Sequence, residues 1–365
     1  MVISKINYPK VTICVPVRNG ALTIRRTLDS LLKQDYPYYE IIVSDNCSDD
    51  NTAEIVKPYV SQGIQYYNNP KTEKWAESNW NYILTLAQGT FIALYHADDI
   101  YTPTMVRRQV EFFIKHPDAS AVFTMTQSID ELDRPIKRGK TELLQELKGK
   151  EIFHYKETLN YTLKYTNFMV VPTMMTKRSV IDRVGVFNCN KYKTASDIDL
   201  YLRMTKVGPI GIIDEPLHKY RISNQQGSAL IFYQRTFLAH FFNVLDDYIS
   251  IPDSNEIIQA DALSVYNLLR ASDQISCAIN MLLLNRVMEA KTNLINALKI
   301  KHMTNALKMA IFEHPRELML FCVGYFLLIS SYLGFGHFSG KQIHKVIQRH
   351  TKNKLKPISE NQDGD

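Results

Sequence analysis

The chain has 365 residues, 45% of them hydrophobic and 22% charged, which is typical of a folded globular protein and excludes a largely disordered one. Residues 341–356 hold six Lys or Arg and no acid, and the other 37 basic residues are balanced by 37 acidic ones, so the formal net charge of +6 resides in this segment. Such a segment favours an anionic surface as partner, with a solvated tail as the alternative, and no nucleic-acid-binding motif occurs.

Cysteine usage and the N-terminus both favour a cytoplasmic chain. The five cysteines show no C-x-x-C spacing, which predicts neither a zinc site nor a disulfide framework and suits a reducing compartment. The first ten residues, MVISKINYPK, lack the apolar core of a signal peptide. We therefore expect the protein to stay in the cytoplasm.

Strand and helix patterns alternate along the first 125 residues. The β-branched run VTICVPV at 11–17 predicts the first strand, and apolar residues at helical spacing over 21–34 predict the first helix. Further strands are predicted at 40–45, 64–67, 91–95 and 119–125, and further helices at 51–60 and 76–88. This alternation is typical of an α/β fold, in which helices cover both faces of a mostly parallel sheet.

Polar residues follow three of the predicted strands. They are Arg18-Asn19, Asp45-Asn46 and Asp98-Asp99. Ligands of parallel α/β sheets bind at the carboxyl ends of the strands, so we expect these residues to line one site. Neither G-x-G-x-x-G after the first strand nor G-x-x-x-x-G-K-[ST] occurs, which argues against dinucleotide and P-loop phosphate sites.

The stretch HADD at 96–99 places two adjacent carboxylates directly after the apolar strand FIALY. Desolvated carboxylates repel each other unless a cation lies between them. Their oxygens suit Mg²⁺ or Mn²⁺, and such an ion can neutralise a leaving diphosphate. Asp98 and Asp99 are therefore candidate metal ligands. The alternative, that Asp99 caps a helix starting near Thr102, explains only one of the two.

Two further acidic stretches are candidates for chemistry. In VSDNCSDDNT at 43–52, Asp45 ends a strand and can accept the imide N–H of a uracil base, whereas 48–52 also fits a polar turn with a helix cap. In TASDIDLYLRM at 194–204, Asp197 is a candidate general base that deprotonates an acceptor hydroxyl. The alternative for Asp197 or Ser196 is a helix N-cap.

Taken in order, these stretches resemble the motifs of a family 2 glycosyltransferase with the GT-A fold, over roughly residues 10–225. P-V-R-N resembles the nucleotide loop P-x-x-N, and S-D-N-C-S-D-D-N-T resembles D-[DN]-x-S-x-D-x-T. H-A-D-D resembles the D-x-D signature, and S-D-I-D-L-Y-L-R resembles E-D-x-D-L-x-L-R. L-H-K-Y-R-I-S at 217–223 resembles the Y-R-I-H end of the domain. Each fragment is a weak signal, but five in the right order are a strong one.

The resemblance implies an inverting transfer of one sugar from a nucleotide-diphosphate sugar, most often a UDP-sugar. The acceptor would be a hydroxyl of a glycan or lipid-linked saccharide in cell-surface polysaccharide synthesis. Asp197 would be the base, and Asp98 and Asp99 would hold a divalent cation, Mn²⁺ or Mg²⁺. Arg221 would help to neutralise the leaving diphosphate. The implied nucleotide-sugar-binding residues are Pro16, Arg18, Asn19, Asp45, Asn46, Asp98 and Arg221.

Three positions depart from the family pattern. His96 replaces the first aspartate of D-x-D, and its imidazole can ligate Mn²⁺ but suits Mg²⁺ poorly; a hydrogen bond to ribose or to a backbone carbonyl is the favoured alternative. Ser196 replaces the glutamate before the base. Ser223 replaces a histidine, so a diphosphate or metal contact is lost or passes to His218 or Gln225. The Q-x-x-R-W motif of processive synthases is absent, which favours transfer of a single sugar.

Two other classes of function fit parts of the pattern. A non-catalytic scaffold that binds sugar nucleotides would explain the replacements at His96 and Ser223, but it has little need of a base such as Asp197. A sugar-phosphate nucleotidyltransferase also places paired aspartates on a metal. It usually carries a Gly- and Lys-rich phosphate loop after the first strand, and VPVRNGALT has no lysine.

The C-terminal part differs in pattern from the predicted catalytic domain, residues 1–228. Residues 229–316 are predicted to form a helical region, because 256–312 show helical periodicity without proline. Residues 317–365 are predicted to be a membrane-associating segment and basic tail. Within them 318–335 are uncharged and would form about 27 Å of helix, which is marginal for crossing a bilayer. We expect attachment to the inner face of the cell membrane beside a polyprenyl-linked acceptor, with a buried core helix as the alternative.

Overall fold

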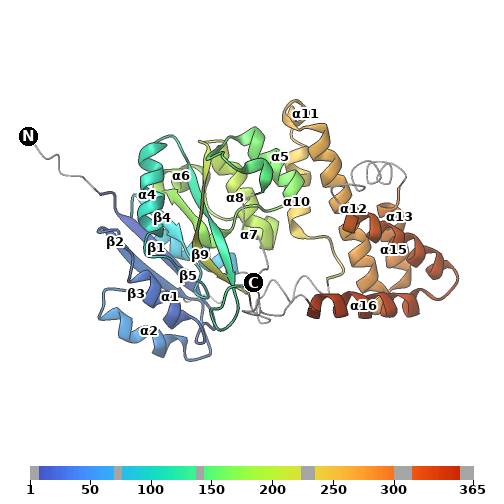
Figure 1. The fold of residues 1–365 in the computed structure, drawn as a ribbon, viewed down its shortest axis with the longest axis horizontal. Helices are drawn as coiled ribbons and strands as arrows, with labels where there is room; N and C mark the ends of the chain where they lie inside the picture. Colours follow the sequence, from blue (N-terminus) through green and yellow to red (C-terminus); the bar gives the residue numbers. More distant parts are fainter. Residues whose placement is uncertain (1–7, 70–75, 137–143, 223–234, 300–314, 354–365) are drawn as a thin grey trace, which may run out of the picture. The chain divides into compact units, whose positions relative to one another are not determined.

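The computed structural model describes residues 8–69, 76–136, 144–222, 235–299 and 315–353 (Figure 1). The chain divides into two compact units. Unit 1 comprises residues 1–159 and 167–222, and unit 2 comprises residues 160–166 and 223–365. Every candidate site residue in the predicted catalytic and binding set belongs to unit 1. Ser223 and Gln225, and the end of the basic tail from 354, lie outside the described residues.

Unit 1 is built on a nine-stranded sheet in the order β3-β2-β1-β4-β8-β6-β9-β5, with β7 paired to β9. One half is parallel and consists of β1 (Val11–Val17), β2 (Tyr39–Asp45), β3 (Gln65–Asn68) and β4 (Phe91–Leu94). The register places Val17 beside Asp45, and Asp45 beside Asn68. The loops after β1 and β2 therefore leave the sheet at the same level of one edge.

The other half of the sheet is mixed in direction. β8 (Met174–Lys177) runs antiparallel to β4 and to β6 (Ala121–Ile129), while β9 (Ile210–Arg221) is parallel to β6. The short strands β5 (Ile100–Tyr101) and β7 (Ile152–Phe153) pair antiparallel with β9. Because Tyr101 pairs with His218, the HADD turn just before β5 is brought to the end of β9.

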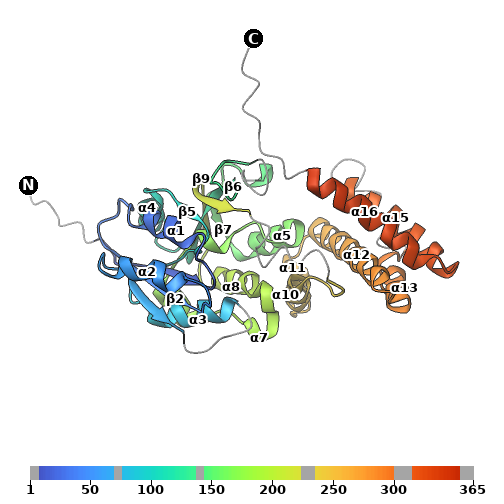
Figure 2. The same cartoon turned by 90° about the horizontal axis from the view of Figure 1, so that it is seen from below.

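Helices cover both faces of the sheet, so the predicted α/β fold is confirmed (Figure 2). Alternate residues of β1, from Val11 to Val17, pack in a core with α1 (Ile24–Leu31), α2 (Thr52–Val60) and α4 (Met105–Lys115). The opposite face is contacted by α3 (Ala76–Leu86), α6 (Arg178–Val184) and α8 (Ser196–Thr205). Unit 1 also contains the short helix α7 (Cys189–Tyr192), and α5 (Tyr155–Tyr165) contributes to both units.

The described part of unit 2 is helical. Its helices are α10 (His240–Ile249), α11 (Ser254–Ile257), α12 (Ala260–Leu283), α13 (Val287–Ala297), α15 (Pro315–Tyr332) and α16 (Gly336–Asn353). Buried side chains of α12, α13 and α15 form its core, among them Ile275, Leu294 and Leu327. Gly324 of α15 lies against Ile275 and Leu298, where a Cβ atom would come within 3.1 and 3.3 Å of their methyl groups.

Helix α15 contains most of the uncharged segment predicted at 318–335. One side is core, since Phe321 and Leu327 are at most 2% exposed, whereas Met319, Phe326 and Ile329 are 56–60% exposed. The helix is therefore partly the core helix that the sequence left open as an alternative. Within the described ranges, no helix combines the length and the hydropathy that crossing a bilayer would need.

Candidate active site

The loops after β1 and β2 interlock at the carboxyl edge of the sheet. The backbone N–H of Asn19 donates to Ser48 Oγ at 2.8 Å, and the N–H of Asp49 donates to Asn19 Oδ1 at 3.0 Å. Asn19 adopts a left-handed conformation with φ of 52°, which a short amide side chain tolerates better than most. Arg18, beside it, is exposed to solvent. The two predicted nucleotide-binding segments are thus neighbours with defined geometry.

Asp45 ends β2 and is 3% exposed. Its Oδ1 accepts hydrogen bonds from the N–H and Oγ of Ser48 at 2.9 and 2.6 Å, and its Oδ2 accepts one from the hydroxyl of Tyr66 at 2.7 Å. Burial and the neighbouring Asp45 carboxylate raise the pKa of Tyr66, so the hydroxyl keeps its proton and donates. Sequence reasoning missed Tyr66, whose only signal was an aromatic residue in a predicted strand.

Asn46 follows Asp45 and is also 3% exposed. Its backbone N–H donates to the carbonyl of Val17 at 2.8 Å, which joins it to the end of β1 next to Pro16. Its side-chain Oδ1 is buried and has no hydrogen-bond partner among the described residues. An unpaired buried acceptor is costly, so this atom is suited to receive a donor from a bound ligand.

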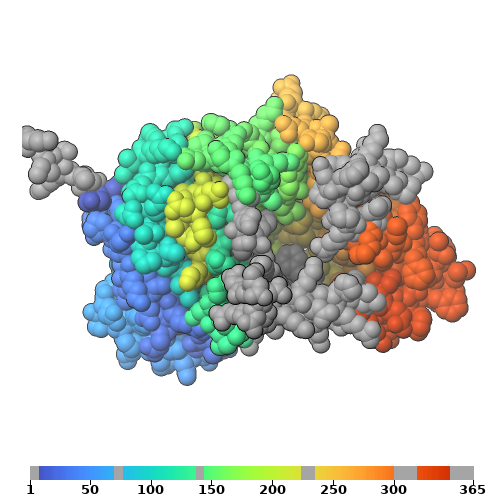
Figure 3. All heavy atoms as spheres, viewed as in Figure 1, coloured from blue at the N-terminus to red at the C-terminus, as the bar shows by residue number. Residues whose placement is uncertain are grey.

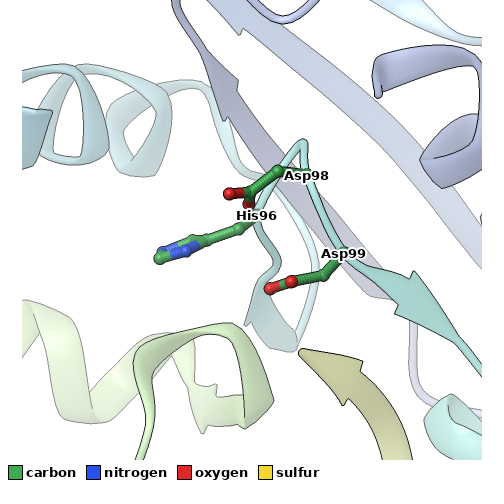
Figure 4. Close-up of side chains that lie close together, drawn as sticks. All are labelled: His96, Asp98 and Asp99. Atoms are coloured by element: carbon green, nitrogen blue, oxygen red, sulfur yellow. The ribbon is translucent and has the colours of Figure 1, made fainter. Parts of the chain in front are cut away.

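The HADD turn carries three potential metal ligands. One ligand atom from each of His96, Asp98 and Asp99 lies within 4.8 Å of the others, and Figure 4 shows the three side chains leaving the turn on the same side. Burial lowers the pKa of His96 to about 4, so its imidazole is neutral near pH 7. Within the described ranges the buried Nε2 of His96 has no hydrogen-bond partner. A neutral imidazole and two carboxylates are a donor set that suits Mn²⁺.

Neighbouring side chains hold the HADD turn in place. Thr27 of α1 donates its hydroxyl to the backbone carbonyls of Ala97 and Asp99, at 2.9 and 2.7 Å. The backbone N–H of His96 donates to the Tyr101 hydroxyl at 2.6 Å. The His96 ring lies 5.2 Å from the Trp80 ring, centre to centre. The turn is therefore built before any ligand arrives.

Asp99 is fully buried and connects the turn to β9. Its Oδ1 accepts the backbone N–H of Arg221 at 2.8 Å, and its Oδ2 lies 2.9 Å from Nε2 of His218, which is also fully buried. The helix-cap alternative does not hold, because α4 begins at Met105 with Thr104 as its N-cap residue. Sequence reasoning had named His218 only as a possible substitute for the missing histidine.

Arg221 ends β9 and is 3% exposed. Its guanidinium donates to the backbone carbonyls of Asp98 and Asp130, each at 2.8 Å, and pairs with Asp133 at 2.5 Å. The first of these contacts places its guanidinium against the backbone of the HADD turn. It also gives Arg221 a clear role in positioning the Asp98 backbone.

Asp197 lies in the first turn of α8 and is half-buried. Its Oδ2 accepts a hydrogen bond from Asn167 Nδ2 at 2.8 Å, and its Oδ1 accepts one from the N–H of Ile198 at 2.9 Å. Burial raises the pKa of Asp197 to about 6, which suits a general base near neutral pH. Asp199 differs, since it pairs with Arg203 one turn further along α8 at 2.8 Å.

A second carboxyl group, Glu77 of α3, belongs to the surroundings of Asp197. Glu77 is 8% exposed, and burial together with the charge of Asp197 raises its pKa to about 7. The next turn of α3 is attached to the segment that leads to α8: Asn81 exchanges hydrogen bonds of 2.8 and 2.9 Å with the backbone of Phe187. Sequence reasoning missed Glu77, because nothing in the spacing of α3 separates it from a solvated helix residue.

Comparisons with known proteins agree with this geometry. Residues 12–185 match the family model described as Glycosyl transferase family 2. The putative glycosyltransferase EpsE of Bacillus subtilis is 29% identical over 217 residues, which are 58% of this chain and 73% of EpsE. The putative teichuronic acid biosynthesis glycosyltransferase TuaG of the same organism is 26% identical over 226 residues, 60% of this chain and 82% of TuaG. An uncharacterized glycosyltransferase of Rickettsia felis is 28% identical, but the match spans only 36% of its length.

Solved structures share the fold at low sequence identity. TarS 1-349 of S. aureus superposes with a TM-score of 0.51 at 16% identity, over 82% of this chain and 92% of that chain. The mannosyltransferase PcManGT of Pyrobaculum calidifontis, solved with GDP-Man and Mn²⁺, gives a TM-score of 0.52 at 16% identity, over 90% and 88%. At this identity the likeness shows the fold alone.

The sheet, its strand-end loops and these matches define a glycosyltransferase with the GT-A fold. Residues 12–185 of the chain match glycosyltransferase family 2, and the curated relatives are named as glycosyltransferases. The resemblance inferred from the sequence motifs is therefore confirmed, and sugar transfer is favoured over the scaffold and nucleotidyltransferase alternatives.

Proposed function

We propose that the chain transfers one sugar, with inversion, from a UDP-sugar to a hydroxyl of a glycan or lipid-linked saccharide during cell-surface polysaccharide synthesis. The observation that carries the proposal is the meeting of two interlocked strand-end loops and the HADD turn at one edge of the sheet. TarS has been solved with UDP and with UDP-GlcNAc, which supports the choice of donor, and TuaG is named for teichuronic acid biosynthesis, which supports the choice of acceptor class.

In this proposal the nucleotide lies over the ends of β1 and β2. Asp45 accepts the imide N–H of uracil, and the unpaired Oδ1 of Asn46 accepts a further donor from the ligand. Pro16, Arg18 and Asn19 form the adjoining wall, with Arg18 exposed and able to reach a phosphate. A carboxylate oxygen can accept more than one hydrogen bond, so Asp45 Oδ2 can receive the base as well as the Tyr66 hydroxyl.

The HADD turn would hold a divalent cation through Asp98 and Asp99, with His96 as a third ligand. The unpaired, neutral Nε2 of His96 supports its ligand role and favours Mn²⁺ over Mg²⁺. When bound, such an ion neutralises charge that develops on the leaving diphosphate. Arg221 would assist cation binding by holding the Asp98 backbone through the hydrogen bond from its guanidinium to the Asp98 carbonyl.

Asp197 would act as the general base. The acceptor oxygen forms its bond to C1 of the donor sugar, the bond from C1 to the nucleotide diphosphate breaks on the opposite face, and Asp197 receives the hydroxyl proton. Burial raises the pKa of both Asp197 and the second carboxyl group, Glu77, and the charge of Asp197 adds to the raised pKa of Glu77, so ionising one disfavours ionising the other.

A panel of radiolabelled UDP-, GDP- and TDP-sugars, incubated with the protein, Mn²⁺ and a bacterial lipid-linked saccharide extract, tests the function. We expect label from a UDP-sugar in the lipid fraction, together with free UDP. Release of diphosphate from UTP and a sugar phosphate would support the nucleotidyltransferase alternative instead, and absence of turnover with every donor would support the scaffold.

We further propose that the protein works at the inner face of the cell membrane, where such an acceptor would be found. Support comes from the basic segment 341–356 and from the partly exposed apolar segment just before it.

A further inference from the structure

The turn between α15 and α16 exposes a cluster of large apolar side chains. Tyr332, Leu333, Phe335 and Phe338 are 63–68% exposed. Gly334, with φ of 87°, makes the turn, and the N–H of Phe335 closes it by donating to the Ser330 carbonyl at 2.8 Å. A closed turn holds these side chains in water, where a contiguous apolar patch marks a contact surface. We call these four residues the apolar tip.

The exposed side of α15 leads into the apolar tip. Met319, Phe326, Ile329 and Leu333 follow one another at intervals of seven, three and four residues, which places them on one stripe of the helix. The other side of α15 carries Phe321 and Leu327, which are buried in the core of unit 2. The core therefore holds the helix so that the apolar stripe faces outward.

The exposed side of α16 begins with the apolar tip and continues as positive charge. Phe338, Lys341 and Lys345 are exposed and share one stripe at intervals of three and four residues, and Arg349 and Lys352 continue the same spacing in the sequence. From 318 to 353 the chain has no Asp or Glu. We call the two exposed lysines, Lys341 and Lys345, the basic stripe.

Contacts with α12 fix the orientation of α16. Nδ1 of His337 lies 2.6 Å from the carbonyl oxygen of Leu282, and a Cβ atom on Gly340 would come within 2.7 Å of the Leu282 side chain. Ile343 packs on the core of unit 2, on the side of α16 opposite Phe338 and Lys345. Figure 3 shows parts of α15 and α16 at the surface.

We propose that the apolar tip and the basic stripe form a surface by which this chain docks on an anionic lipid bilayer. The tip would enter the boundary between headgroups and acyl chains, and the basic stripe would lie along the phosphates. A lipid surface fits better than a second copy of the chain, because a symmetric pair would bring two basic stripes together. The inference deepens the membrane attachment proposed above and is independent of the donor sugar.

Sedimentation of the full-length protein with vesicles tests the surface. The vesicles contain phosphatidylcholine alone, or phosphatidylcholine with about 30% phosphatidylglycerol. Phosphatidylglycerol is anionic and gives the vesicle surface the negative potential that attracts basic side chains. We expect binding to the anionic vesicles only, weakened by 0.5 M salt (roughly a 4 Å Debye length) because screening acts on the basic stripe. The double variant Phe335→Ser with Phe338→Ser should lower the partition coefficient at least about tenfold, because the apolar area that the two phenylalanines would bury in the bilayer is lost.

Lys341→Gln with Lys345→Gln should lower the partition coefficient by about 30-fold, as each lysine near an anionic surface contributes a factor of roughly five. Matched controls in unit 1 are Ile114→Ser, which removes a side chain that is 68% exposed, and Lys57→Gln on α2; neither should change binding. Unchanged melting curves and nucleotide binding in all variants would show that they remain folded.

Equal binding of wild type and both double variants to anionic vesicles would overturn the proposal, as would no binding by wild type. A dimer of the wild type in solution that Phe335→Ser with Phe338→Ser converts to a monomer would also overturn it, in favour of a second copy as occupant. Variants that lose vesicle binding should still transfer sugar to a soluble acceptor. Failure of the lipid-docking proposal is therefore distinguishable from failure of the proposed sugar transfer.

Discussion

At the residue scale, Asp197 is the side chain on which the proposed chemistry depends. Replacing it with asparagine keeps the hydrogen bond from Asn167 possible but removes the base. We expect kcat to fall by about 10²–10⁴-fold with nucleotide affinity unchanged. Because burial raises its pKa to about 6, wild-type kcat should rise with pH up to this value and then level off. A steady-state pH series for wild type and Asp197→Asn measures both; an active variant would exclude Asp197 as the base.

Glu77 gives a prediction about stability that does not depend on turnover. Its pKa in the folded protein is raised to about 7, so the folded state binds the proton more tightly than the unfolded chain. The stability from this group is complete below about pH 4 and is lost as pH rises towards 7. Glu77→Gln should therefore match wild type at about pH 4 and exceed it above pH 7, by up to about 3 kcal/mol.

Urea unfolding at several pH values measures this difference for wild type and Glu77→Gln. Glu54→Gln on α2 is the control, because Glu54 is exposed. Asp197→Asn should reduce the pH dependence of the free energy of unfolding, since the Asp197 charge is one of the causes that raise the pKa of Glu77. Parallel pH profiles for Glu77→Gln and wild type would contradict the raised pKa.

At the scale of elements, Ser48 joins two loops of the candidate site. Its hydroxyl donates to Asp45 and accepts the N–H of Asn19. Ser48→Ala should lower the free energy of unfolding by about 1 kcal/mol and weaken UDP binding, because the loops lose their common hydrogen bonds. Ser61→Ala, at the exposed end of α2, is the control. Calorimetric titration with UDP measures the affinities of both variants. Equal affinities for Ser48→Ala and the control would contradict a nucleotide site formed by these two loops.

Helix α15 offers a matched pair of substitutions on its two sides. Leu327 is fully buried and Ile329 is 59% exposed. Leu327→Ala should destabilise unit 2 by about 3 kcal/mol, whereas Ile329→Ala should change stability by less than about 0.5 kcal/mol. Thermal unfolding in the absence of lipid measures both. Equal effects would show that the helix is not anchored in the core as described.

Sequence reasoning reached the strand-end residues because position along a parallel strand predicts where a side chain emerges. It placed Asp45, Asp98 and Asp197 in ordered motifs, and the α/β fold followed from alternation. It could not find Tyr66 or Glu77, whose importance depends on which distant carboxylate they approach. It also could not decide whether α15 is a core helix or a membrane-associating helix, because an uncharged run has the same composition in both.

At the scale of the whole molecule, the chain combines a glycosyltransferase unit with a helical unit. The residues of the two proposals fall in different units: those proposed for nucleotide, metal and base lie in unit 1, and the apolar tip and basic stripe lie in unit 2. We therefore expect substitutions in the apolar tip to leave UDP binding unchanged. Asp98→Ala, in turn, should leave vesicle binding unchanged.

The central claim is that unit 1 binds a uridine diphosphate through a cation at the HADD turn. Thermal stabilisation by UDP, with and without Mn²⁺, tests it most directly on wild type and Asp98→Ala. At about 100 times the dissociation constant, UDP with Mn²⁺ should stabilise wild type by about 2.7 kcal/mol, and the Mn²⁺-dependent part should vanish in Asp98→Ala. Stabilisation that is the same in both proteins, or absent from wild type with every nucleotide tried, would contradict the account.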